Sequence, residues 1–287
     1  MLQLTQRYPK KRAFITGGGS GLGKAFSLQL AEDGWTIGIC DINKKGMEQT
    51  ANAVKALGGK AFTYRLDVSD EKAYQKVAEA FLDDADGIDL LINNAGVGDG
   101  GSFHTYPLEN WHWLMGINFN GVLYGCYFFV PYMRQQKNGH IINIASMAGI
   151  ANAPSTAPYN VSKAAVISLS ETLFYELHPH NVKVSSVEPT FFKTNVLQHA
   201  RGPKATQAMA QRMIDRSDLE VEPVAQEILA KAGQEQLHII LPKSARQQAW
   251  MKRFFPKVFQ GRILKMVYKM REKLRTEGTA ELGKNQF

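Results

Sequence analysis

The chain of 287 residues has only two cysteines and no long uninterrupted apolar run. Cys40 and Cys126 are far apart, and each falls within an apolar stretch, so we expect two buried free thiols. This pattern excludes a disulfide-stapled secreted scaffold and fits a reducing compartment. A run of ~18 consecutive apolar residues, which is typical of a membrane-spanning helix, does not occur.

The first ten residues lack the apolar core and the small-residue cleavage pattern of a signal peptide, so we expect a cytoplasmic protein. The seven histidines show no metal-ligand spacing apart from His178-Pro179-His180. That triplet falls at an expected helix end and is typical of solvated side chains. No metal site is therefore predicted.

The excess positive charge is confined to one segment near the C-terminus. Eleven of the lysines and arginines and one acid, Glu272, lie between Lys243 and Arg275, so this segment has a net charge of +10. The net charge of the whole chain is +8. The remaining residues carry −2 and are close to neutral. A body without a basic groove argues against nucleic acid as a partner.

Apolar, β-rich runs alternate with segments of helical period along most of the chain. The pattern predicts strands over 12–16, 35–41, 60–66, 88–93, 140–145, 182–188 and 237–241, and helices over 21–33, 43–57, 70–84, 107–134, 157–177 and 221–232. Several strands are almost continuously apolar, as expected where helices cover both faces of a parallel sheet. The predicted fold class is α/β: a doubly wound parallel sheet of about seven strands, a Rossmann fold.

The order of elements also predicts the domain organisation. Residues 1–242 are expected to form a single dinucleotide-binding and catalytic domain. Within it, 190–218 is too long for an ordinary strand-to-helix connection and is interpreted as a substrate lid. Residues 243–287 are expected to form a basic amphipathic C-terminal extension with a helical tail.

A glycine-rich turn joins the first expected strand to the first expected helix. Its residues are Thr16, Gly17, Gly18, Gly19, Ser20, Gly21, Leu22 and Gly23. Glycines let the backbone approach a pyrophosphate, and the N–H groups at a helix N-terminus bind anionic oxygens. A glycine-rich turn alone is also compatible with a flexible loop, but here the strand and the helix stand where a dinucleotide needs them.

Asp41 follows at the end of the second expected strand, ~20 residues onward, where an acid can accept hydrogen bonds from the adenosine ribose. Its charge would repel a 2′-phosphate, so NAD is favoured over NADP. Lys24, Lys44 and Lys45 could reach a phosphate and keep NADP open as the alternative. A carboxylate in this position could also simply cap the following helix.

The spacing of Gly17, Gly21 and Gly23 after Thr16 resembles the short-chain dehydrogenase/reductase family, and the resemblance extends almost to Pro242. It implies further cofactor contacts at the ends of later strands, namely Asp67, Val68, Asn94, Ala95, Gly96, Pro189, Thr190, Phe192 and Thr194. Thr190 departs from the Pro-Gly that the family usually has. The resemblance therefore implies a slightly reshaped pocket at this point.

Tyr159 and Lys163 are four residues apart on an expected helix and project from one face. A nearby ammonium favours phenolate, so we expect Lys163 to lower the pKa of Tyr159 from ~10. Such a pair is also common on helix surfaces. The resemblance adds Ser146, which faces this tyrosine in the family. It also adds Asn118 in Asn118-Phe119-Asn120-Gly121, which in the family interrupts the long helix and holds a water in a proton relay.

These residues imply proton transfer by Tyr159, stabilisation of the substrate oxygen by Ser146, and contact of Lys163 with the nicotinamide ribose. The expected substrate contacts beyond Ser146 and Tyr159 are apolar: Met147, Phe191, Met209 and Met213. They predict an apolar alcohol, ketone or aldehyde, lipid-like or steroid-like, as the substrate. The alternative is a lid that only packs on the body.

The C-terminal segment combines apolar side chains at helical spacing with lysines and arginines. The apolar positions are Phe259, Ile263, Met266, Val267, Met270 and Leu274, preceded by Trp250, Met251, Phe254 and Phe255 and by an expected break at Pro256. Two interpretations stay open: an anionic membrane surface as the partner, or docking onto the body or a partner subunit. The resemblance also implies a homodimer or homotetramer through the two long central helices.

The predicted function is therefore a nicotinamide-dependent oxidoreductase, with NAD favoured. The alternative is a non-catalytic NAD-binding module tethered to membrane or nucleic acid by its basic tail. The complete set Asn118, Ser146, Tyr159 and Lys163 argues against this alternative, because a binding module needs none of them.

Overall fold

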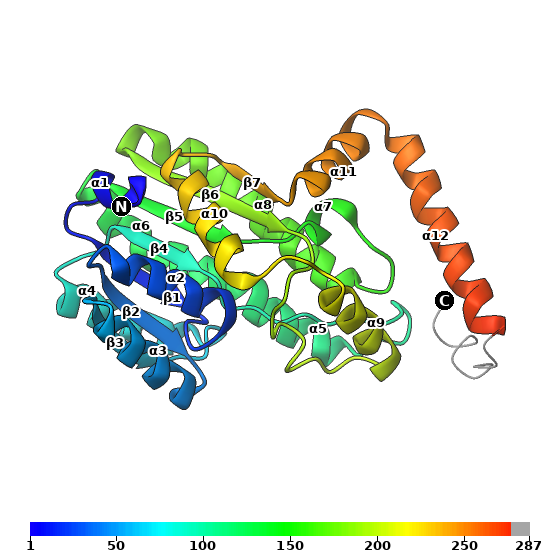
Figure 1. Cartoon of the computed structure of the whole chain (residues 1–287), viewed down its shortest axis with the longest axis horizontal. Helices are drawn as coiled ribbons and strands as arrows, with labels where there is room; N and C mark the ends of the chain where they lie inside the picture. The colour runs from blue at the N-terminus through cyan, green and yellow to red at the C-terminus, as the bar shows by residue number, and fades with distance from the viewer. Residues whose placement is uncertain (277–287) are drawn as a thin grey trace.

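A parallel sheet of seven strands forms the centre of the computed structural model, which describes residues 1–276 (Figure 1). The strand order is β3-β2-β1-β4-β5-β6-β7, so the chain winds outward from β1 first in one direction and then in the other. The strands are β1 Arg12–Thr16, β2 Thr36–Asp41, β3 Lys60–Arg65, β4 Leu90–Asn93, β5 Gly139–Ile144, β6 Val182–Pro189 and β7 His238–Leu241. The predicted doubly wound α/β fold is confirmed.

Helices cover both faces of the sheet, and each face has its own apolar core. One core includes side chains of α2, α3 and α10, and the other includes side chains of α4, α6 and α8. The helices are α1 Gln3–Arg7, α2 Gly21–Glu32, α3 Lys44–Ala56, α4 Glu71–Ala85, α5 Leu108–Met115, α6 Gly121–Gln135, α7 Ala148–Ala151, α8 Ala157–Leu177, α9 Lys204–Asp215, α10 Val221–Gly233, α11 Lys243–Phe254 and α12 Pro256–Thr276. A 3-10 turn, His178–His180, follows α8. The central strands are buried throughout because both of their faces are covered.

The helix expected over 107–134 is interrupted. A π-helical turn, Gly116–Asn120, separates α5 from α6 and carries Asn118. A single π-turn of this kind is frequent at functional sites. The combined stretch Leu108–Gln135 is long and apolar enough to cross a membrane by length and composition. Here α6 packs against β4 and β5, as a core helix does.

Two other segments are more ordered than the sequence pattern indicated. The expected lid, 190–218, contains α9, and α7 follows β5 directly. In the C-terminal extension α11 ends at Phe254 and α12 begins at Pro256, which confirms the expected break. Residues 277–287 of the predicted extension lie outside the described part, as do the side chains of Met270 and Leu274. Cys40 and Cys126 are buried and free, as predicted.

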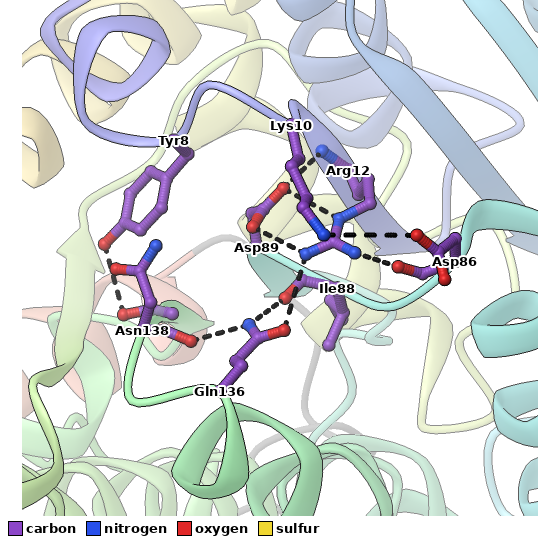
Figure 2. Close-up of polar contacts among 9 residues, drawn as sticks. Tyr8, Lys10, Arg12, Asp86, Ile88, Asp89, Gln136 and Asn138 are labelled. Atoms are coloured by element: carbon purple, nitrogen blue, oxygen red, sulfur yellow. Dashed lines mark hydrogen bonds and ion pairs between the residues drawn. The ribbon is translucent and has the colours of Figure 1, made fainter.

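The amino ends of β1 and β4 are joined by a buried ion pair (Figure 2). The Arg12 guanidinium donates to both oxygens of Asp89, at 3.0 Å from Nε and 2.9 Å from Nη2. The backbone N–H of Arg12 adds a third bond to Asp89, and the guanidinium also donates to the Asp86 carbonyl. Gln136 of the α6 terminus donates to the carbonyls of Ile88 and Asn138. At the carboxyl end of the sheet, side chains bind main-chain groups instead.

Candidate active site

The glycine-rich turn at the carboxyl end of β1 packs so closely that side chains are excluded from it. Gly17 has φ +65°, and a Cβ there would lie 2.9 Å from Cα of Ala95. A Cβ on Gly23 would lie 2.2 Å from the Gly17 carbonyl oxygen. Gly17 is therefore required for its backbone conformation, and neither Gly17 nor Gly23 has space for a side chain. The turn leads directly into α2, whose first N–H groups have no partner within the helix.

Thr16 and Asn94 join the glycine turn to the end of β4. Thr16 Oγ1 accepts from the N–H groups of Asn94 and Ala95, at 3.0 and 3.1 Å. In return Asn94 Nδ2 donates to the carbonyl of Thr16 at 2.9 Å. Thr16 was predicted as part of the glycine-rich turn, without a role of its own. The only local signal was a hydroxyl residue at the last position of a strand before the glycines.

Asp41 lies beside the same turn. Its carboxylate accepts from the N–H of Gly19 and from the N–H of Asn43, each at 2.9 Å. Ser20, at the N-cap of α2, is exposed, and Leu22 is buried in the core, so Leu22 can offer a ligand only its main chain. A cradle without side chains, a helix N-terminus and an acid at its rim fit a dinucleotide.

Asp67 and Val68 follow β3 on the same side of the sheet. Asp67 is exposed and accepts from the N–H and the hydroxyl of Ser69, at 2.9 and 2.7 Å. Val68 is buried against Gly121, where a Cβ would lie 2.8 Å from its side chain. Val68 thus positions the beginning of α6 at the carboxyl end of the sheet.

Asn118 is fully buried, and its amide is occupied by main-chain groups. It accepts from the N–H of Val97 at 2.8 Å and donates to the carbonyl of Val97 at 2.9 Å. Its Nδ2 is also 3.3 Å from the hydroxyl of Ser162 on α8. The π-turn therefore links Val97, in the loop after β4, to α8, and the contact through Ser162 was not predicted from the sequence.

Ser146 and Tyr159 meet where β5 ends and α8 begins. The Ser146 side chain is buried, and its hydroxyl accepts from the N–H of Ala148 at 3.1 Å. Burial raises the pKa of Tyr159, and a hydrogen bond with Ser146 opposes that rise. The expected lowering of the Tyr159 pKa is therefore wrong for this structure, because burial of the phenol outweighs the hydrogen bond with Ser146.

Lys163 points from α8 to the end of β5. Its Nζ donates to the Ile144 carbonyl at 2.8 Å and lies 5.8 Å from the centre of the Tyr159 ring. Burial lowers the pKa of Lys163 to about 8. A Cβ on Gly96 would lie 3.3 Å from Asn118 Oδ1 and 3.5 Å from Lys163 Nζ. All four predicted catalytic residues therefore come from elements that meet at one point of the carboxyl edge.

The segment after β6 closes the other side of this edge. Met147 N–H donates to the Pro189 carbonyl, and Thr190 N–H donates to the Leu241 carbonyl, each at 2.9 Å. Phe192 is buried in the core, so its side chain is not available to a cofactor. Thr194 Oγ1 lies 4.0 Å from the position of a Cβ on Gly21, across the chain from the glycine turn. The predicted contact of Thr194 is thus compatible with the fold.

A hollow of about 370 Å³ lies between the glycine turn and the lid. It is lined by Gly21, Lys193, Thr194, Asn195, Gln211, Ile214, Asp215 and Val221. The lid helix α9 thus turns Gln211, Ile214 and Asp215 toward the hollow. Of the predicted substrate contacts, Met147 is buried, whereas Phe191, Met209 and Met213 are more than two-fifths exposed. Their contact with a substrate stays a prediction.

Asp99 fastens the lid to the loop after β4. This buried carboxylate accepts from the hydroxyl of Tyr106 at 2.6 Å and from the N–H groups of Arg201 and Gly202 at 3.1 and 2.8 Å. The N–H of Gly98 also donates to the Val196 carbonyl at 2.8 Å. Asp99 was not predicted as a site residue, because its partners Arg201 and Gly202 are about a hundred residues away in the sequence.

These features define a Rossmann-fold protein with a dinucleotide cradle beside a Ser–Tyr–Lys–Asn set. The model of the family described as short chain dehydrogenase matches residues 11–205. The chain therefore belongs to the short-chain dehydrogenase/reductase family, which confirms the resemblance seen in the sequence, and is an oxidoreductase.

Individual proteins agree with this assignment. The chain is 33% identical over 233 residues to the 3-oxoacyl-(acyl-carrier-protein) reductase FabG of Thermotoga maritima, covering 81% of this chain and 94% of the relative. It is 29% identical to a cyclohexanol dehydrogenase of an Acinetobacter strain, covering 68% and 78%. A short-chain dehydrogenase/reductase of Burkholderia phymatum, solved in complex with NAD, superposes with a TM-score of 0.81 at 30% identity, covering 86% and 94%. These similarities support a nicotinamide cofactor.

Proposed function

We propose that this protein is an NAD-dependent dehydrogenase or reductase that acts on an apolar alcohol or its carbonyl counterpart. The observation that carries the proposal is the meeting of Ser146, Tyr159 and Lys163 beside a glycine cradle that has Asp41 at its rim. A nicotinamide cofactor, when bound, supplies the hydride chemistry. The cradle, Asp41 and Thr194 would hold its dinucleotide, and Lys163 would hold its nicotinamide ribose.

The protein's own residues handle the proton and the developing charge. Tyr159 exchanges a proton with the substrate oxygen, and the Ser146 hydroxyl donates a hydrogen bond to that same oxygen. Because burial raises the pKa of Tyr159, its phenol is protonated at neutral pH and is ready to act as an acid toward a carbonyl. Alcohol oxidation needs the phenolate, so its rate should rise with pH while carbonyl reduction falls.

Replacement of Tyr159 by Phe tests the catalytic assignment. We expect turnover to fall about 10²–10⁴-fold, the usual contribution of a positioned acid or base, while NAD binding measured by fluorescence titration stays unchanged. Tyr268→Phe is the control, because Tyr268 is an exposed tyrosine on α12 and belongs neither to the site nor to the proposed subunit interface. Near-normal turnover in Tyr159→Phe would remove Tyr159 from the mechanism.

The preference for NAD is proposed from Asp41, which stands next to the glycine turn and would repel a 2′-phosphate. Replacing Asp41 by Asn should lower the ratio of kcat/KM with NAD to that with NADP by about tenfold, the effect of 1.4 kcal/mol. Asp83→Asn, at an exposed position of α4, is the control. An unchanged ratio, or NADP preferred by the wild type, contradicts the proposal.

An apolar substrate is proposed from Met147 beside the site and from apolar side chains of the lid. The relatives named for cyclohexanol and for 3-oxoacyl groups are consistent with a predominantly apolar substrate. The test is a panel of sterols, retinoids, fatty alcohols, small secondary alcohols and sugar alcohols, followed by absorbance of the reduced cofactor. The highest kcat/KM for a sugar alcohol would contradict the apolar assignment. NAD binding without turnover of any compound would favour a binding module.

We further propose that the protein forms a homodimer or homotetramer through its long central helices. Large side chains are exposed on α6 and α8: Tyr127, Tyr132, Val161 and Tyr175. Exposed aromatic side chains on adjacent helices are typical of an interface between subunits. Light scattering after gel filtration should show a multimer, and Tyr127→Glu should shift it toward the monomer. A monomeric wild type contradicts the proposal.

A further inference from the structure

Three aromatic side chains gather at the corner between α11 and α12 and remain exposed. The ring of Trp250 lies 5.4 Å from that of Phe254 and 5.3 Å from that of Phe255, centre to centre. Each of the three is at least half exposed. Isolated exposed apolar residues are ordinary, but a contiguous aromatic cluster marks a surface that meets something other than water.

The cluster lies on the side of α11 that faces away from the body. Helix α11 packs against β7 and α7, with Ala245 buried and Lys252 donating to the Ile150 carbonyl. Trp250 and Phe254 are four residues apart and lie on the opposite side of the helix from Ala245 and Lys252. Trp250 and Phe254 therefore lie away from the side by which α11 is attached to the body.

Positive charge surrounds the cluster. The Arg253 guanidinium is 5.8 Å from the centre of the Phe254 ring, and both Arg253 and Lys257 are exposed. Arg262, Lys265 and Lys269 continue the exposed basic series along α12. The sequence has no acid from Lys243 to Arg271. Aromatic residues with lysines and arginines at an exposed corner are typical of segments that lie on anionic membranes.

The predicted apolar stripe of α12 is only partly available for such contact. Phe259 is buried, and Ile263 and Val267 are half-buried, whereas Met266 is exposed. The first turns of α12 therefore use part of the stripe for packing, and the element against which α12 packs is α11. The outward aromatic corner is a separate feature, and it is the one that bears on the membrane interpretation.

We propose that the corner between α11 and α12 docks this protein on an anionic lipid bilayer, with Trp250, Phe254 and Phe255 inserted at the headgroup level and Arg253 and Lys257 against the lipid phosphates. The rest of the chain carries a formal charge close to neutral, so the attraction is confined to this extension. Figure 1 shows α11 and α12 at the same end of the molecule as α7 and α9, projecting beyond the sheet.

The location of the corner also concerns the substrate. Helix α11 touches α7, which follows Ser146 and Met147 directly in the chain. If the proposed apolar substrate is correct, docking would place the catalytic edge close to the membrane that dissolves such a compound. Membrane binding itself does not depend on that proposed function and is tested without any measurement of turnover.

The test is flotation of the full chain with two kinds of vesicle, phosphatidylcholine alone and phosphatidylcholine mixed with phosphatidylglycerol. We expect binding to the mixed vesicles only, with a blue shift of tryptophan emission. The variant W250S/F254S/F255S should bind at least about tenfold more weakly, since insertion of apolar side chains supplies much of the affinity. R253E/K257E should also lose most binding, and added salt should weaken the wild type.

Matched controls separate docking from general effects. Leu57→Ser removes an exposed apolar side chain at the end of α3, and K72E/K76E reverses two exposed charges on α4. Both should bind vesicles like the wild type, and the thermal transition of every variant shows that it is folded. Equal binding of the corner variants and the wild type, or no binding to anionic vesicles, overturns the proposal. A wild type that binds oligonucleotides and not vesicles also overturns it, in favour of nucleic acid.

Discussion

The two ends of the parallel strands are held together by different chemistry. At the amino end, Arg12 and Asp89 form a buried ion pair in which side chains satisfy one another. At the carboxyl end, Thr16, Asn94 and Asn118 bind main-chain groups and leave a cradle of glycines and helix N–H groups. At the amino end the polar side chains bind one another, whereas the carboxyl end has backbone N–H groups that could bind a ligand. Stability and activity should therefore respond to substitutions at different ends.

The largest expected effect on stability lies at the amino end. Arg12→Leu leaves the Asp89 carboxylate buried without its partner, which should lower the free energy of unfolding by about 3–5 kcal/mol. The double variant R12L/D89L should recover part of this loss, because no unpaired charge remains. Urea denaturation measures both, and the kcat of the folded fraction should stay near that of the wild type. A stable Arg12→Leu protein with impaired kcat would contradict the division between the two ends.

Burial of Lys163 at the carboxyl end of the sheet should lower the free energy of unfolding at neutral pH. Its pKa of about 8, lowered by burial from 10.5, means that the unfolded chain binds a proton between these pH values and the folded protein does not. The free energy of unfolding of the wild type, minus that of Lys163→Met, should therefore rise by up to about 3 kcal/mol from pH 8 to 10.5. Below pH 8 the difference should be constant. A flat difference across this window would show that Lys163 is not desolvated.

Gly23→Ala tests whether the cradle depends on the absence of a side chain. A Cβ at this position would lie 2.2 Å from the Gly17 carbonyl oxygen, so the turn must shift. We expect a loss of about 1–3 kcal/mol in stability and a clear loss of NAD affinity in fluorescence titration. Gly261→Ala is the control, because nothing lies within 4 Å of its added Cβ. Unchanged NAD affinity in Gly23→Ala would exclude this turn from the cofactor site.

The smallest expected effect concerns the lid. Asp99→Asn weakens the bonds that hold Arg201 and Gly202 and should raise KM severalfold with little change in kcat, since a hydrogen bond to a charged group contributes about 1 kcal/mol more than one to a neutral group. The Arg201 guanidinium lies 4.1 Å from the centre of the Trp113 ring, so lid opening should change tryptophan emission. W113F provides the control for that signal. An unchanged KM and emission would show that Asp99 does not hold the lid.

Much of the fold could be predicted because alternating apolar runs and helical periods are local properties. The strands at 12–16 and 182–188 and the helix at 157–177 agree with the structure to within a residue. The interruption of the helix at Asn118 was implied only by the family resemblance, because the π-turn is stabilised by bonds to the distant residues Val97 and Ser162, which no local pattern records. Helix α9 was not predicted, because the interpretation of 190–218 as a lid used only the length of that segment.

The sequence by itself determined the order of strands and helices and the position of the glycine-rich turn after the first strand. It also determined the position of Asp41 at the end of the second strand and the spacing of Tyr159 and Lys163. These depend on backbone conformation and on residues that are neighbours along the chain. Only the tertiary structure decided that Asp99 holds the lid, that Arg12 pairs with Asp89, and that burial raises the pKa of Tyr159. Such properties arise from distant segments that fold into contact and from the water that packing removes, and local sequence patterns record neither.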